Sequence, residues 1–208
     1  MIDSTKLAEF QALANAVAAA LGGKVTQPPS AENYWYCQLS APDMPIALDL
    51  RGKDGRIDAS PVWPHYRDER GNRQYIHARD VLDYAQRHNP PATSISVAIS
   101  RGAAAIAKDI QRRLIPPALP VYQAAVKRCR DNEAHTEGVA ATTRRLAKAL
   151  GVEARDNGAR AALYVDGGLV LGISSPDSVR FEHFYCDPDT ALKVVALVRA
   201  SRKEETQS

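Results

Sequence analysis

The segment Ser94–Asn132, SISVAISRGAAAIAKDIQRRLIPPALPVYQAAVKRCRDN, constrains the fold of this chain most strongly. Apolar residues alternate with small polar ones at its start, which predicts a half-buried strand over 94–100. Ser100 is then expected to cap a helix that begins near Ala103. The pair Pro116-Pro117 is expected to end this helix, because an internal proline removes a backbone donor and clashes with the preceding turn.

Two more helices are expected after the proline pair. Pro120 stands at a favourable first-turn position for one of them, and Glu137–Leu150 has the apolar period of the other, which Gly151 ends. One apolar stripe of each helix should face the core. The predicted inward residues are Ala103, Ile106, Ala107, Ile110 and Leu114, then Tyr122, Ala125, Val126 and Cys129, then Val139, Thr143, Leu146, Ala147 and Leu150.

The region before this segment is expected to begin with one long helix and three strands, followed by a less regular part. Thr5–Leu21 repeats apolar residues at steps of three and four, and Gly22-Gly23 follows as a helix end. The other predicted elements are strands over 34–40, 46–51 and 56–60, a loop over 60–74, a short strand at 75–76 and a helix over 78–88.

The region after this segment is again rich in predicted strands. Asp166-Gly167-Gly168 joins Arg160–Val165 to Leu169–Ser174 in the clearest hairpin of the sequence. A further strand is expected over 179–186 and a last helix over 190–200, followed by a disordered tail over 201–208.

These elements predict an α+β fold with two small antiparallel β-sheet regions, one N-terminal and one C-terminal, around a basic helical middle. Each sheet region should hold three or more strands. The corresponding regions are residues 1–100, 101–150 and 151–200, and a single compact domain is the alternative. Both ends follow the order of one helix and three strands, which either an internal duplication or chance explains.

Positive charge is concentrated in the predicted helical middle. Residues 101–160 carry 12 Lys and Arg against 6 Asp and Glu, a net +6, whereas the whole chain has a net charge of +3. Because each helix buries one stripe, its cations should emerge on the remaining faces, where phosphates are a natural partner. The predicted nucleic-acid-binding residues are Lys108, Arg112, Arg113, Lys127, Arg128, Arg130, Arg144, Arg145 and Lys148.

A second candidate surface lies in the predicted loop over 60–74. Trp, Tyr and Arg carry much of the binding energy in protein interfaces. The predicted interface residues are Trp63, His65, Tyr66, Arg67 and Arg70. They would serve a protein–protein interaction module or a homodimer; the alternative is that Trp63 packs beneath the loop as a core residue.

Sequence motifs for catalysis or cofactor binding do not rise above background. The chain has no GxGxxG, no GxxxxGK[ST] and no GxSxG, which are the phosphate-loop and nucleophile-elbow patterns. The turn Ser100-Arg101-Gly102 precedes a helix N-terminus, where a phosphate can bind, but an ordinary strand-to-helix joint explains it better. No catalytic residue and no cofactor is therefore predicted.

Two other groups of residues could in principle carry chemistry. His183 and Cys186 would point to opposite faces of a strand, which works against joint metal ligation, and no metal site is predicted. Asp49, Asp54 and Asp58 could pair as carboxylates for acid–base chemistry, but Asp54 reads as a turn residue and Asp58 as an exposed one.

The cysteines and the apolar runs bear on the cellular compartment. Cys37, Cys129 and Cys186 are odd in number and far apart, which favours a reducing compartment over a disulfide framework. No targeting segment is recognised, and the most apolar run, Ala12–Leu21, is too short to cross a bilayer. The expectation is a cytoplasmic protein without a membrane partner.

The favoured hypothesis is a non-enzymatic protein that binds nucleic acid or a nucleoprotein complex through its basic helices. A compact chain without recognised motifs would also suit an accessory or inhibitor protein of a phage or mobile element. The alternatives are the interaction module already described and an enzyme whose site forms only in three dimensions.

Overall fold

The structure, a computed structural model, describes residues 4–30, 35–68, 71–156, 161–165, 169–183, 186, 188–190 and 193. The chain has the predicted α+β fold and divides into two compact units. The first unit contains Met1–Tyr66 and Arg73–Asp131, and the second contains Arg67–Asn72 and Asn132–Ser208. Each unit is built on an antiparallel sheet, so the two β-rich ends of the chain form separate sheets.

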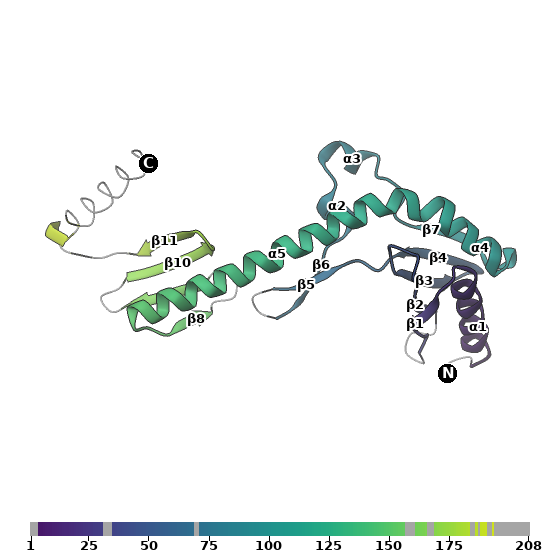
Figure 1. Ribbon diagram of the computed structural model, residues 1–208, viewed down its shortest axis with the longest axis horizontal. Helices are drawn as coiled ribbons and strands as arrows, with labels where there is room; N and C mark the ends of the chain where they lie inside the picture. The colour runs from purple at the N-terminus through teal and green to yellow at the C-terminus, as the bar shows by residue number, and fades with distance from the viewer. Residues whose placement is uncertain are drawn as a thin grey trace. The chain divides into compact units, whose positions relative to one another are not determined.

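Five strands form the described sheet of the first unit, in the order β1-β2-β3-β4-β7 (Figure 1). They are β1 (Lys24–Gln27), β2 (Tyr36–Ser40), β3 (Leu48–Lys53), β4 (Arg56–Pro61) and β7 (Ile95–Ala98). Each neighbouring pair is antiparallel. The alternation in the sequence sorts apolar residues to one face of this sheet and polar residues to the other.

Helix α1 (Ser4–Ala20) and helix α4 (Ala103–Asp109) pack together in the first unit. Their buried side chains form one core with the apolar residues of the sheet, as the helical period predicts. The largest fully buried members are Phe10, Leu39, Ile46, Leu48, Leu50, Ile57, Ile106, Ile110 and Leu114. Burial of side chains of this size is the main stabilising contribution to such a unit.

The predicted loop over 60–74 contains a two-stranded sheet, so that prediction was wrong in part. Strand β5 (His65–Arg67) pairs with β6 (Arg73–Tyr75). The side chains of Tyr66 and Ile76 pack against Ala125. The local sequence of this segment is rich in proline and charge and indicates a loop. Contact with a helix that is distant in the sequence keeps the segment extended.

The predicted helix over 78–88 is two short helices, α2 (Ala78–Val81) and α3 (Tyr84–His88). Leu82 between them is extended, with ψ of 138°, and is buried. Asp83 caps α3 by accepting a hydrogen bond from the backbone N–H of Gln86 at 2.8 Å. A buried leucine followed by a strong capping residue favours a new helix start over continuation of the old one.

The joint between β7 and α4 also differs from the prediction. Ile99–Arg101 forms the short 3₁₀ turn η1, and Gly102, with φ of 76°, is the N-cap residue of α4. The prediction that Ser100 caps this helix was therefore wrong. Ser100 is part of the 3₁₀ turn, so it does not stand at the start of the helix. The chain leaves this turn with a positive φ, which glycine adopts without strain.

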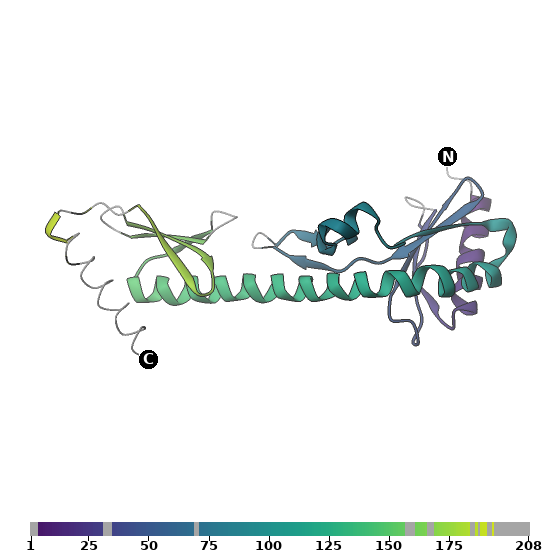
Figure 2. The same cartoon turned by 90° about the horizontal axis from the view of Figure 1, so that it is seen from above.

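The predicted helix breaks at the prolines are absent over the described stretch 103–150. Helix α4 continues through the π-helical segment η2 (Ile110–Leu114) into α5 (Ile115–Leu150), which Figure 2 shows as an uninterrupted helix. The N–H of Ile115 bonds to the carbonyl of Ile110, five residues earlier. This wider turn gives room for the ring of Pro116 against the preceding carbonyls, so the proline pair is accommodated by a π segment instead of ending the helix.

Burial along this helix follows most of the predicted inward stripe. Ile106, Ala107, Ile110, Leu114, Ala125, Cys129, Val139, Thr143 and Ala147 are buried. Two predictions differ from the structure. Val126 is only partly buried while Val121, not predicted to face inward, is buried, and Leu150 is 40% exposed. Leu150 is the last residue of α5, where the end of the helix is exposed.

The described sheet of the second unit has the order β11-β10-β9-β8. The strands are β8 (Ala154–Asp156), β9 (Ala161–Val165), β10 (Leu169–Ser175) and β11 (Ser178–His183). Leu169 pairs with Val165, which confirms the predicted hairpin. Thr142 of α5 donates a hydrogen bond to the carbonyl of Pro176 at 2.8 Å and so ties the helix to the β10–β11 turn. Most of the predicted last helix over 190–200, and the tail, lie outside the described residues.

The cysteines give a direct test of burial. Cys37 and Cys129 are buried and Cys186 is exposed, all three as thiols. Burial raises the pKa of the Cys37 thiol to about 12, with a smaller contribution from the charge of Asp49. At pH 8 a thiol reagent should therefore modify Cys186 quickly and the other two slowly, since the thiolate is the reactive form. Counting modified thiols with and without denaturant checks this, and a fast phase that persists in Cys186→Ser would contradict it.

Candidate nucleic-acid interface

The nine predicted phosphate-binding cations are all exposed. Six of them belong to the first unit: Lys108, Arg112, Arg113, Lys127, Arg128 and Arg130. Arg144, Arg145 and Lys148 belong to the second unit. The expectation that burial of one stripe directs the cations to the surface is thus confirmed for the whole set.

Acidic residues divide the cations of α5 into two groups along the helix. Asp131, Glu133 and Glu137 are exposed and stand between Arg130 and Arg144 in the sequence. Lys127 forms an ion pair with Asp131, with Nζ 3.0 Å from Oδ2. Exposed pairs of this kind contribute little to stability, so Lys127 remains available to another anion.

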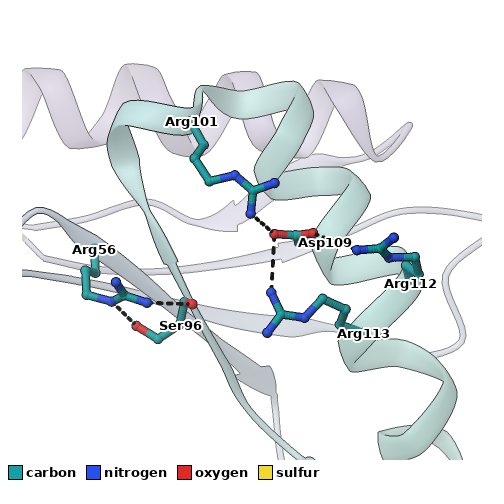
Figure 3. Close-up of polar contacts among 6 residues, drawn as sticks. All are labelled: Arg56, Ser96, Arg101, Asp109, Arg112 and Arg113. Carbon is teal, nitrogen blue, oxygen red and sulfur yellow. Dashed lines mark hydrogen bonds and ion pairs between the residues drawn. The ribbon is translucent and has the colours of Figure 1, made fainter.

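Three arginines of the first unit converge on one buried carboxylate, as Figure 3 shows. Asp109 has a side chain only 4% exposed, and its Oδ2 accepts a hydrogen bond from Arg101 Nη1. Arg113 Nη1 lies 3.5 Å from the same oxygen, and Arg112 Nη2 lies 3.8 Å from Oδ1. We call Arg101, Arg112, Arg113 and Asp109 the arginine cluster.

Helical spacing explains why the arginine cluster forms. Arg112 and Arg113 follow Asp109 by three and four residues, the distances at which helical side chains meet. Arg101 reaches the same carboxylate from the 3₁₀ turn that precedes α4. Asp109 is at the end of α4 on its buried face, so its carboxylate depends on these guanidinium groups for compensation.

The arginine cluster leaves unused binding capacity at the surface. Three guanidinium charges against one carboxylate leave a net charge of +2. The side chains of Arg101 and Arg113 are 50% exposed and that of Arg112 is 71% exposed. Each guanidinium has five N–H donors, and the carboxylate holds them in place without using all of them. Such prepositioned donors suit phosphate oxygens, which arginine binds in a bidentate manner.

The polar face of the first unit's sheet forms a second feature, a cleft of about 710 Å³. It is lined by Tyr36, Gln38, Asp49, Arg51, Asp58, Ala59, Ser60, Val62, Trp63, Tyr75, His77, Ser94, Ile95 and Ser96. Strands β2, β3, β4 and β7 supply the floor, where Arg51 faces Asp58 and Asp58 faces Ser96 in register. At the edge of this face Arg56 donates hydrogen bonds to Ser96, at 2.8 Å to Oγ and 2.9 Å to the carbonyl oxygen (Figure 3).

A hydrogen-bonded group of three side chains organises part of this floor. Tyr36 donates its hydroxyl proton to Asp49 Oδ1 at 2.7 Å, and Gln38 Nε2 donates to the Tyr36 oxygen at 2.6 Å. Burial, and then the bond to Asp49, raise the pKa of Tyr36 to about 12. Tyr36 therefore keeps its proton at neutral pH and acts as a hydrogen-bond donor rather than as a base.

The fold separates one of the three aspartates of the possible carboxylate site from the other two. Asp49 and Asp58 both line the cleft, whereas Asp54 has φ of 50° and forms the β3–β4 turn. The described residues contain no group of three or more His, Cys, Asp or Glu side chains placed to hold a metal ion. The polar period of β3 and β4 is the sequence signal that identifies the cleft residues, because alternate positions share one face.

The aromatic interface candidates are divided between core and surface. Trp63 and Tyr66 are partly buried against Ile76, Ala125 and Cys129. His65 and Arg67 are exposed, and the guanidinium of Arg67 donates to the carbonyl of Gly71 at 2.6 Å. Arg70 lies outside the described residues. The Trp63 side chain thus packs against this buried cluster and also lines the cleft.

Comparison with known proteins identifies no relative. No family model, no curated protein and no solved structure matches this chain. Within the part of the chain that the structure describes, no helix is both long and apolar enough to cross a membrane. The features of this chain that bear on its function are therefore the arginine cluster, the exposed cations and the cleft.

Proposed function

We propose that this protein binds nucleic acid, free or within a nucleoprotein complex, through the cations of its helices. The observation that carries the proposal is the arginine cluster, in which buried Asp109 holds three partly exposed guanidinium groups together. Positioned guanidinium groups lose less conformational entropy on binding a phosphate than freely moving ones. The other exposed cations of α4 and α5 add attraction that does not depend on base sequence.

The test must separate lost phosphate contacts from lost stability. Removing the arginines alone would strand the buried Asp109 carboxylate, so the variant carries Arg101→Gln, Arg112→Gln and Arg113→Gln together with Asp109→Asn. Asp109→Asn alone is the matched control, because it keeps all three guanidinium groups. Circular dichroism and thermal unfolding would show that both variants are folded.

Binding to fluorescent oligonucleotides over a range of salt concentrations is the measurement. The wild-type protein should lose affinity steeply as salt rises, because phosphate contacts release counterions. The fourfold variant should bind about tenfold more weakly than the control, with a log–log salt slope shallower by about two. Replacing Arg144, Arg145 and Lys148 by Gln should have a smaller effect, since no buried carboxylate is seen to hold these side chains in the described residues.

Two results would contradict the proposal. One is a wild-type protein whose binding is absent or insensitive to salt. The other is a fourfold variant that binds as tightly as Asp109→Asn, which would show that the arginine cluster is a structural ion pair only.

A further inference from the structure

The first unit has a row of five aromatic rings, of which Trp63, Tyr75 and His77 line the cleft. His65 and Tyr75 have ring centroids 5.3 Å apart, Tyr75 and His77 6.2 Å, His77 and Trp63 6.1 Å, and Trp63 and Tyr122 6.4 Å. Tyr75 and His77 are close to parallel, with 23° between their planes. We call these five residues the aromatic row.

Strand geometry explains the exposure of these rings. Tyr75 and His77 are two residues apart and share one side of an extended segment, while Ile76 between them is buried. Tyr75 is 49% exposed, and His65 and His77 are exposed as well. Folding leaves apolar ring faces in contact with water at the mouth of a cleft, where a flat ligand would cover them favourably.

The rest of the cleft offers hydrogen-bonding groups beside these rings, and an arginine of β6 outside the cleft lining adds positive charge nearby. Asp58 and Ser60 on the floor can accept from amino groups, and among the described residues Asp58 forms no ion pair with Arg51, its neighbour across the strands. Arg73 is exposed and precedes Tyr75 by two residues on the same side of β6. Rings for stacking, acceptors for base edges and nearby arginines are the groups that unpaired nucleotides require.

We infer that the aromatic row and its cleft form a stacking site for the bases of single-stranded nucleic acid. This inference rests on the proposed function and makes it more specific. Bases would stack on Tyr75 and His77, their edges would meet Asp58 and Ser60, and Arg73 would lie near the phosphates. A duplex keeps its base faces covered, so the site favours single strands over double strands.

The experiment compares matched pairs of variants in the full-length protein. Tyr75→Ala with His77→Ala removes two rings of the aromatic row. Tyr84→Ala with His88→Ala removes another exposed pair, whose ring centroids are 4.5 Å apart on α3 and which does not line the cleft. Tyr75→Phe keeps the stacking surface and removes only the hydroxyl. Each variant is tested with a DNA strand, an RNA strand of the same sequence and the corresponding DNA duplex.

We expect the Tyr75 and His77 variant to bind single strands at least about tenfold more weakly, because stacking contributes strongly for each base. Its duplex affinity and its salt slope should stay close to those of the wild type, since no phosphate contact is removed. The Tyr84 and His88 variant and Tyr75→Phe should bind single strands as the wild type does. The DNA and RNA arms show whether the sugar matters to the site.

Several outcomes would overturn the inference. The wild type could bind single strands and duplex with equal affinity. The Tyr75 and His77 variant could bind single strands as tightly as the wild type, or the Tyr84 and His88 variant could lose as much affinity as it does. If the wild type binds with steep salt dependence in these cases, the proposed function survives and only the stacking site fails. Absence of any salt-dependent binding would remove both.

Discussion

Replacing Arg101 and Arg113 together by Ala should destabilise the first unit by about 3 kcal/mol. Both side chains contact Oδ2 of Asp109, whose side chain is 4% exposed. Without them, Arg112, at 3.8 Å from the other oxygen, is the one cation left beside the buried carboxylate among the described residues. A buried charge that loses its partners keeps its desolvation penalty, and this penalty is the source of the expected loss.

A third substitution makes this prediction specific. Adding Asp109→Ala to the double variant removes the stranded charge and should recover most of the lost stability. Asp109→Ala alone should cost less than the double variant, because the partly exposed guanidinium groups can turn to water. Urea unfolding followed by tryptophan fluorescence measures the effect in the first unit, which contains both tryptophans, Trp35 and Trp63. Failure of Asp109→Ala to restore stability would show that Arg101 and Arg113 act through packing instead.

Gly23→Ala should also lower the free energy of unfolding by about 3 kcal/mol, because the added Cβ clashes with its surroundings. A Cβ at this position would meet the backbone carbonyl of Ser40, and would lie 2.7 Å from the Cβ of Ala41. The surrounding backbone cannot easily move, since the N–H of Gly23 bonds to the carbonyl of Ala18 at 2.8 Å and Ser40 is paired with Lys24 across β1 and β2. Either the helix end or the strand pair would have to shift.

The neighbouring glycine provides the matched control. Gly22 has φ of 74°, and a Cβ there would have no atom within 4 Å. Gly22→Ala should therefore cost only the strain of the left-handed conformation, about 1 kcal/mol. Comparing the two variants by urea unfolding separates strain from steric exclusion. Equal costs, or a larger cost for Gly22→Ala, would contradict the argument.

The sequence predicts most strands of the two main sheets because alternation and turn residues are local signals. The hairpin of β9 and β10 and the strands β2, β3 and β4 all follow from them. The short strands β1 and β8 carry too few residues for such a signal and were not predicted. The helix break at Pro116-Pro117 was predicted wrongly, because there tertiary packing outweighs the local signal. Local rules count a proline as a helix end, but a wider π turn and a buried stripe that continues from Leu114 to Ala125 stabilise the uninterrupted helix.

The candidate site was predictable only in part. Helical period alone places Arg112 and Arg113 on the surface, because Ile110 and Leu114 must be buried. Period cannot show that Asp109 is buried beside them or that Arg101 reaches the same carboxylate. That arrangement depends on the 3₁₀ turn and on the packing of α4.

The aromatic row shows the same limit. Trp63 and His65 stand out in the sequence as candidates for contact with a partner. Their neighbours Tyr75 and His77 do not, because the pairing of β5 with β6 is what brings the rings together. Local chemistry selects residue types, whereas contacts between residues far apart in the chain select which of them share a site.

The sequence by itself thus specifies the α+β class, most strands of the two main sheets and the positive charge of the helices, since these depend on period, turn residues and composition. The continuity of the long helix, the arginine cluster and the cleft come from tertiary packing. Burial contributes to each of them. It favours the continuous helix over a break at the prolines, it places Asp109 where its carboxylate needs three arginines, and burial of Ile76 leaves Tyr75 and His77 exposed.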